Sequence, residues 1–314
     1  MIGEVITATF VISFLAATLR MTVPLLFGTI GEAFAERSGV LNLGIEGMML
    51  MGASVAFTTT FYTGSLWLGV GAAVVVGILL GLLMAFLTVT MGAQQHVSGL
   101  AVFFLGMGLS FYLYRIFVGE LGGVPPTVTP FRPVHIPILG DIPVLGPILF
   151  QQYILVYIAL LLVPIAAFIF DRTTLGLQIT AVGQNPKAAD TAGINVFRIR
   201  YLCLLVAGAL SAVGGAWFSI AQSSMFLPLM TAGRGWVCIA LVVFGNWMPY
   251  RILIGALLFG GIDALQTSLQ AVGIAFPYRV LQMLPYIFTI IVLVAVARRA
   301  TYPAALLKPY RREE

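Results

Sequence analysis

Residues 171–200 read DRTTLGLQITAVGQNPKAADTAGINVFRIR, a long polar stretch between segments of membrane-spanning character. At its centre, Asn185 suits a helix N-cap, and Pro186 suits the first helical position, where a missing N–H costs nothing. Gly193 suits the end of the same helix. The spacing therefore predicts a short helix over residues 186–192. Two helical turns are too short to persist alone, so we interpret residues 171–200 as a cytoplasmic loop whose helix docks a partner.

The composition is that of an integral membrane protein. Of 314 residues, 60% are hydrophobic and 9% are charged, whereas about 25% of the residues in a soluble domain are charged. Apolar runs of about 20 residues, enough to cross a bilayer, recur along the chain. We expect one all-α, polytopic transmembrane domain over residues 1–314, with eight or nine spans. The predicted spans are residues 4–30, 40–61, 66–90, 97–118, 151–170, 201–222, 236–245, 252–272 and 281–296.

Two of these segments are irregular. Arg20 and Pro24 interrupt residues 4–30, so this segment is either one kinked span or two short pieces. Residues 236–245 are long enough only for a short or half span. Between the first two spans, we expect Glu32, Glu36 and Arg37 to form a turn at the membrane surface.

Basic residues predict the topology. Nine of the sixteen Lys and Arg residues lie in two segments. They are Arg172, Lys187, Arg198 and Arg200 in the central loop and Arg298, Arg299, Lys308, Arg311 and Arg312 in the tail. The positive-inside rule places the loop and the tail, residues 298–314, in the cytoplasm. Residues 119–150 hold seven of the sixteen prolines and a single basic residue, so we expect an extended loop on the outer face.

Enzymatic motifs are missing from the sequence. Neither lysine lies in a GxxxxGK[ST] motif, so the chain is not itself a P-loop ATPase. HExxH and GxSxG are also absent, and His96 and His135 fall at opposite predicted faces. Cys203 and Cys238 lie in apolar segments without CxxC spacing, so we expect packing roles for them. We expect no enzyme activity, metal site, cofactor or nucleic-acid partner.

Two carboxylates inside apolar segments need an explanation. A charged Glu46 or Asp263 at bilayer depth costs at least about 2.5 kcal/mol unless it is paired or hydrated. Asn42 lies one turn before Glu46, and Gln266 lies three residues after Asp263, so each carboxylate is expected on a polar helical stripe. The stripes either line a path for a polar solute or hold helices together by hydrogen bonds. The sequence leaves both interpretations open.

Three stretches together resemble a known family. They are ERSGVLNLGIEGMMLMGA (residues 36–53), AVGQNPKAADTAGI (residues 181–194) and GRGWVCIALVVFGNWMPYRILIGALLFGGIDALQ (residues 233–266). The chain resembles the permease subunits of bacterial ABC importers of the branched-chain amino acid and simple-sugar class, over residues 15–298. The first stretch is most similar to the nucleoside and simple-sugar members.

The resemblance implies a multi-pass protein of the bacterial cytoplasmic membrane and a set of partners. Two permease subunits, expected to differ, would form the pathway, two cytoplasmic ATPase domains would drive it, and an extracytoplasmic binding protein would deliver the solute. Nucleosides are the expected solute, with simple sugars or branched-chain amino acids as alternatives. The residues expected to couple to the ATPase are Gln184, Asn185, Pro186, Lys187 and Asp190. The resemblance also leads us to expect Glu-Asn-Pro-Arg in many relatives where this chain has Gln-Asn-Pro-Lys, a difference that would change the charge of the ATPase contact.

Two other function classes remain. An ion-driven secondary transporter would use Glu46 and Asp263, and an intramembrane enzyme would act on a substrate in the bilayer. The short capped helix favours the ABC permease, because a secondary transporter has no need of such a docking element.

Overall fold

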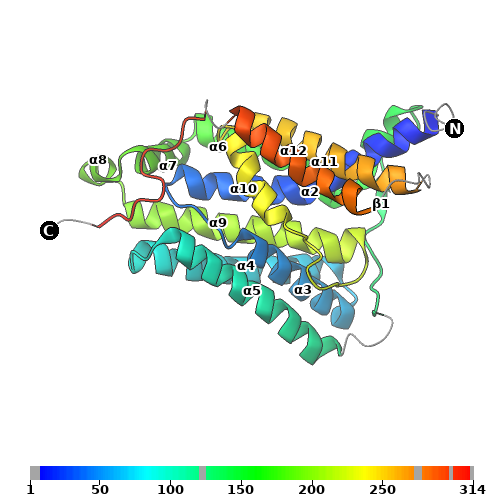
Figure 1. The fold of residues 1–314 in the computed structure, drawn as a ribbon, viewed down its shortest axis with the longest axis horizontal. Helices are drawn as coiled ribbons and strands as arrows, with labels where there is room; N and C mark the ends of the chain where they lie inside the picture. The colour runs from blue at the N-terminus through cyan, green and yellow to red at the C-terminus, as the bar shows by residue number, and fades with distance from the viewer. Residues whose placement is uncertain (1–7, 120–124, 272–277, 297–299, 312–314) are drawn as a thin grey trace.

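The computed structural model describes residues 8–119, 125–271, 278–296 and 300–311, and Figure 1 shows long helices running along one axis of an elongated bundle. The long helices are α2 (Ala8–Arg37), α3 (Ile45–Thr63), α4 (Leu66–Ala85), α5 (Gln95–Val118), α6 (Ile154–Arg172), α9 (Val196–Trp217), α11 (Pro249–Ala271) and α12 (Tyr278–Val296). The shorter ones are α7 (Thr174–Gln184), α8 (Pro186–Thr191) and α10 (Arg234–Phe244). Three π-helical turns complete the helical content: η1 (Phe86–Thr90), η2 (Gly146–Phe150) and η3 (Phe218–Gln222).

The predicted all-α polytopic fold is confirmed. Among the described residues, six helices are long and apolar enough to cross a membrane: α2, α4 with η1, α5, α6, α9 with η3, and α11. Helices α3 and α12 have 19 residues each, which corresponds to a rise of about 28 Å. With these two and the short α10, the described part of the chain has the eight or nine elements that the sequence predicts.

Helix α2 resolves the first irregular segment and corrects the expected turn after it. The helix runs from Ala8 to Arg37 with Pro24 inside it, so one long span is the correct alternative. The expected surface turn at Glu32 and Glu36 is wrong, because both residues belong to this helix and are 0% and 1% exposed. The Asn42 backbone N–H donates to Glu32 at 2.8 Å and the Trp247 indole donates to Glu36 at 2.7 Å. These bonds allow the carboxyl groups to be buried.

The proline-rich segment contains more regular structure than the sequence indicated. Strand β1 (Pro133–His135) pairs antiparallel with β2 (Gln151–Tyr153), with Pro133 opposite Tyr153. The predicted span over residues 151–170 therefore begins three residues too early, because residues 151–153 are extended and α6 starts at Ile154. Three-residue strands carry too little alternation to be recognised from sequence.

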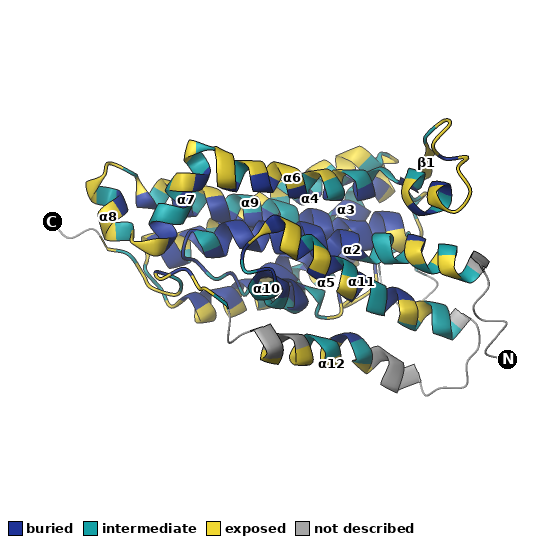
Figure 2. Ribbon diagram, turned by 90° about the horizontal axis from the view of Figure 1, so that it is seen from above, coloured by how far each residue is buried: buried dark blue, intermediate teal, exposed yellow. Residues whose placement is uncertain are grey.

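Helices α9 and α2 form the centre of the bundle. The span that contains α9 is 78% buried, against 22 to 44% in the other five. Helix α9 packs against α2, α3 and α4, while α2 also contacts α6, α10 and α11. Figure 2 shows the buried residues concentrated along these inner helices and the exposed ones on the outer surfaces.

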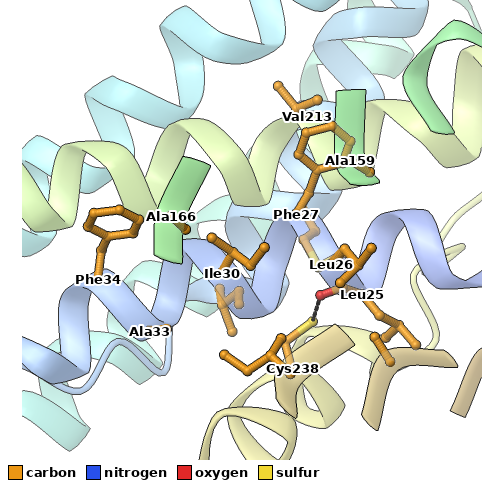
Figure 3. Close-up of a cluster of buried hydrophobic side chains, with 14 of the residues drawn as sticks. Leu25, Leu26, Phe27, Ile30, Ala33, Phe34, Ala159, Ala166, Val213 and Cys238 are labelled. Atoms are coloured by element: carbon orange, nitrogen blue, oxygen red, sulfur yellow. Dashed lines mark hydrogen bonds between the residues drawn. The ribbon is translucent and has the colours of Figure 1, made fainter. Parts of the chain in front are cut away.

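Side chains from four helices meet around α2. Figure 3 shows Phe27 of α2 directed toward Val213 of α9 and Ala159 of α6, with Cys238 of α10 on another side of the helix. The Cys238 thiol donates to the Leu25 carbonyl at 3.7 Å. Both cysteines are free and buried, which confirms their predicted packing role.

Small residues allow the close approach of α9 and α4. A Cβ added at Gly208 would overlap the carbonyl oxygen of Gly77, and one added at Gly77 would overlap the carbonyl oxygen of Gly208. The two backbones are therefore in direct contact, as expected for helices that associate in a bilayer without help from water.

The two ends of the bundle are formed by different segments of the chain. Helices α7 and α8 and the described tail lie at one end, and β1 lies at the other (Figure 1). The Ala305 N–H donates to the Gly183 carbonyl at 2.9 Å, so the tail contacts the central polar stretch directly. The two basic segments thus share one end, as the charge pattern requires if both lie on one side of the membrane. Arg298, Arg299 and Arg312 lie outside the described residues.

The contact between α9 and α4 generates a stability prediction. Gly208→Ala should lower the free energy of unfolding by about 1–3 kcal/mol, because the added methyl group overpacks a backbone contact. A Cβ added at Gly71 of α4, the helix that Gly208 contacts, meets nothing within 4 Å, so Gly71→Ala is the matched control. Thermal unfolding of the purified protein in detergent measures both. Equal melting temperatures for the two variants would contradict the packing described here.

Candidate functional site

Helix α8 has the predicted cap and termination. It spans Pro186–Thr191, and the Asn185 side-chain oxygen accepts from the Ala188 N–H at 3.1 Å. Gly193 has φ of +84°, the left-handed conformation common after a helix C-terminus. The predicted helix is confirmed. Ala189 is its one buried residue, so most of α8 is presented outward at the end of the bundle.

Helix α7 was not predicted. Residues 174–184 are helical where the sequence was interpreted as loop, and the Thr173 hydroxyl caps the helix by accepting from the Gly176 N–H at 3.2 Å. The signal was present in the sequence as a threonine followed by the periodic apolar residues of LGLQITAV. Helix α7 carries the chain to α8 and packs against it, so the two helices form one platform.

The predicted coupling residues lie together on this platform. Gln184 is the last residue of α7, and its side-chain oxygen accepts from the Ala304 N–H at 3.4 Å. Asn185 and Lys187 are exposed, while Pro186 and Asp190 are partly exposed. The structure therefore gathers all five predicted residues at one surface at the end of the bundle.

Inside the bundle, Glu46 holds the start of α10. One carboxylate oxygen accepts from the Thr231 hydroxyl at 2.5 Å and the Gly233 N–H at 2.8 Å. The other accepts from the Gly235 N–H at 2.6 Å. The first N–H groups of a helix have no partner within it and attract negative charge. Glu46, which is 4% exposed, thus accepts hydrogen bonds from N–H groups at the start of α10, although the two lie far apart in the sequence.

The segment bound by Glu46 has an unusual backbone. Ala232 has φ of +48° and Gly233 has φ of +80°, both in the left-handed region, which costs a residue with a Cβ about 1–2 kcal/mol. At Gly235 a Cβ would overlap the backbone and carboxylate of Glu46. A residue without a Cβ is therefore needed at position 235 for the Glu46 carboxylate to reach this backbone.

Arg234 extends from this same segment to the second carboxylate. Its Nε atom donates to Asp263 on α11 at 3.0 Å, with exposed side-chain fractions of 24% for Arg234 and 11% for Asp263. The guanidinium also lies 5.3 Å from the centre of the Phe218 ring. Tyr286 of α12 donates to the Ala232 carbonyl. Residues 231–235 thus connect the two carboxylates that the sequence identified separately.

A small cavity adjoins this ion pair. It has a volume of about 20 Å³ and is lined by Arg234, Asp263, Tyr286 and apolar neighbours. That volume is close to the space of a single water molecule, so this cavity is too small to hold a larger solute.

The two predicted polar stripes have different outcomes. Asn42 lies before α3, which begins at Ile45, so the expected helical stripe with Glu46 is wrong. Asn42 instead accepts from the Gly44 N–H at 3.0 Å and shapes the entry into the helix. Gln266 does share α11 with Asp263 and is partly exposed.

Sequence reasoning missed Thr231, Arg234 and Gly235. The one signal was an isolated arginine between two glycines at residues 233–235, in a segment otherwise almost without charge. Its acidic partner lies 29 residues away and the partner of Gly235 lies 189 residues away, so no local pattern could pair them.

Comparison with known protein families identifies the family of this chain. The model for the branched-chain amino acid transport system permease component matches residues 14–297. The chain belongs to this permease family. No solved structure matches the permease.

Relatives of known description cover nearly the whole permease. A Haloferax volcanii protein, provisionally named glucose ABC transporter permease protein TsgC13, is 39% identical over 97% of this chain and 99% of its own. The guanosine ABC transporter permease protein NupQ of Bacillus subtilis is 36% identical over 94% and 95%. The nucleoside ABC transporter permease protein NupC of Lactococcus lactis is 37% identical over 92% and 94%.

Each of these organisms also has a second, more distant match to the permease. The identities are 28% for the nucleoside permease NupB of Lactococcus lactis, 23% for the guanosine permease NupP of Bacillus subtilis and 25% for the glucose permease TsgB13 of Haloferax volcanii. They cover 80%, 83% and 78% of this chain. The chain is an ABC transporter permease by these matches.

The bonds of Glu46 generate a second stability prediction. Glu46→Gln should destabilise the permease by about 1–3 kcal/mol, because the amide NH₂ would face an N–H donor and leave it unsatisfied. Thr231→Val removes a single donor and leaves the carboxylate its two backbone bonds, so it should cost only about 1 kcal/mol. Thermal unfolding in detergent compares the two. Glu46→Gln as stable as the unmodified protein, or less costly than Thr231→Val, would contradict this account.

Proposed function

We propose that this permease and a second, related permease together form the membrane pathway of an ATP-driven importer. Two cytoplasmic ATPase domains would energise it, and an extracytoplasmic binding protein would deliver the solute. The relatives support a heterodimer, because three organisms each have two permeases whose names differ by one letter. In each organism one permease is 36 to 39% identical to this chain and the other is 23 to 28% identical. The whole chain would be one permease domain of a bacterial cytoplasmic membrane.

The proposed solute is a nucleoside. Two of the three similar relatives are named for guanosine or nucleosides. The relative at 39% identity is named for glucose, which keeps simple sugars as the alternative. The family description keeps branched-chain amino acids as a third class. An ion-driven transporter or an intramembrane enzyme gains no support from this family.

The proposed coupling element is α8 with its flanking residues, on the cytoplasmic side. This proposal rests on the capped, outward-facing geometry of α8. Gln184, Asn185, Pro186, Lys187 and Asp190 would contact the ATPase. The cytoplasmic side is proposed from the positive-inside rule, because the basic loop of residues 171–200 and the described basic residues Lys308 and Arg311 of the tail lie at this end of the bundle (Figure 1). The tail of residues 298–314 would be cytoplasmic as a whole.

Loss of the α8 cap should uncouple transport. Asn185→Ala combined with Pro186→Gly removes a cap worth about 0.5–2 kcal/mol and a preset first turn worth up to about 1 kcal/mol. We expect ATP-dependent uptake of labelled guanosine, or of labelled glucose if the solute is a sugar, to fall about tenfold. ATPase subunits that co-purify with the permease should fall in parallel.

Asn195→Ala is the matched control for this experiment. Asn195 caps α9 at the same end by accepting from the Arg198 N–H at 3.0 Å, but α9 is held by its own packing. The control should keep its ATPases and its uptake. Equal behaviour of the two variants would contradict a coupling role for α8.

We further propose that the polar residues of α11 line the solute path. Asp263 is held in place by Arg234, and Gln266 is partly exposed one turn away. In this view Glu46 and Asn42 act indirectly, because Glu46 holds the segment that directs Arg234 and Asn42 shapes the entry into α3. The cavity of about 20 Å³ beside Asp263 would widen when the path opens.

Substitutions on α11 test the path. Asp263→Asn keeps a hydrogen bond to Arg234 but removes the charge, so solute uptake should change about tenfold in rate or apparent affinity. Gln266→Ala should shift the apparent affinity, while Thr267→Ala, an exposed neighbour on the same helix, should not. Unchanged uptake kinetics in both Asp263→Asn and Gln266→Ala would leave only a structural role. Uptake that depends on an ion gradient through Asp263 would contradict ATP-driven import.

A further inference from the structure

A groove separates α8 from the C-terminal tail. Its volume is about 510 Å³, and it is lined on one side by residues 184–187 and on the other by residues 304, 305 and 308–311. Residues 184–187 are four of the five residues proposed to contact the ATPase. The tail thus provides the opposite wall of a depression that begins at the coupling element.

Contacts from inside the bundle fix the tail. Ala305 is 3% exposed, and its N–H donates to the Gly183 carbonyl at 2.9 Å. Arg200, which is 1% exposed, donates from Nη1 to the Lys308 carbonyl at 3.3 Å and from Nε to the Ser38 carbonyl at 3.2 Å. The Tyr310 ring lies 5.9 Å from that of Phe197. The outer wall is therefore a positioned surface and not a loose chain end.

The groove is positively charged. Lys187 lies on the α8 side, and Lys308 and Arg311 lie on the tail side, all three exposed. Among the described residues that line the groove, none is acidic. A cationic cleft attracts carboxylate-rich segments and disfavours basic ones.

We propose that this groove is the second half of the ATPase docking surface and binds an acidic segment of an ATPase subunit. The proposal rests on the proposed coupling function of α8 and extends it to the tail. A protein occupant is favoured over a lipid headgroup by position, because the groove adjoins α8, which lies at the extreme end of the bundle beyond α6 (Figure 1). One ATPase surface would then contact two walls that belong to distant parts of the chain.

Charge reversal of the tail tests the proposal. The double variant Lys308→Glu/Arg311→Glu changes two side chains, while the backbone bond from Arg200 to residue 308 is kept. Arg198→Glu is the matched control, because Arg198 is an exposed basic residue at the same end that does not line the groove. Ala304→Trp fills the groove without changing its charge. Retention of ATPase subunits on the purified permease is measured over a range of salt concentrations, together with ATP-driven uptake.

We expect about tenfold lower retention and uptake for Lys308→Glu/Arg311→Glu, with a reduced salt dependence, and lower retention for Ala304→Trp. Arg198→Glu should behave like the unmodified permease. Normal retention and uptake in both groove variants, while Asn185→Ala/Pro186→Gly fails, would overturn the tail proposal and leave the coupling function intact. An unmodified permease that retains no ATPase would instead overturn the coupling function.

Reconstitution into lipid vesicles tests whether a lipid headgroup, and not an ATPase segment, occupies the groove. The double variant is reconstituted with its ATPases into phosphatidylcholine vesicles with and without phosphatidylglycerol. A defect of equal size in both vesicle types supports a protein occupant. A defect that appears only with the anionic lipid would assign the groove to a headgroup and overturn the proposal.

Discussion

The carboxylate of Glu46 is the interaction on which the interior of the permease depends. It accepts three hydrogen bonds from residues 231–235 and so holds a backbone with left-handed residues in place. Without an acceptor, two N–H groups at the start of α10 would be buried in an apolar bundle, at a cost of about 1–3 kcal/mol each. Arg234, which lies in this segment, donates to Asp263 at 3.0 Å. A single side chain on α3 thus sets the geometry of a contact between α10 and α11.

The packing of α9 follows a different principle. In a bilayer, helices gain little from burying apolar side chains, so van der Waals packing and interhelical hydrogen bonds hold them together, and small residues let the backbones come into direct contact. The mutual approach of Gly208 and Gly77 achieves this contact on α4. The result is an inner layer of α9 packed against α2, α3 and α4. The short α10, held by Glu46, contacts α2, α3, α11 and α12, so a change in one carboxylate affects the contacts of several helices.

Periodicity and composition were sufficient for much of this fold. The apolar runs predicted the spans, and Asn185-Pro186 predicted α8 because capping is a local effect. The pairing of Glu46 with residues 231–235 was out of reach, since it joins segments that no local pattern relates. Glu32 and Glu36 were misplaced for the same reason, because their partners Asn42 and Trp247 make burial possible. Asn42 was assigned to a helix because α-helical spacing alone does not show where the first turn begins.

The buried Arg200 ties together three segments that are distant in the sequence. Its guanidinium binds the Ser38 carbonyl in one direction and the Lys308 carbonyl in the other. Because Arg200 is 1% exposed, these carbonyls replace water as its partners. Displacing the tail would leave a buried cation with one acceptor fewer, so the groove wall opposite α8 is held in place by the cost of an unsatisfied charge.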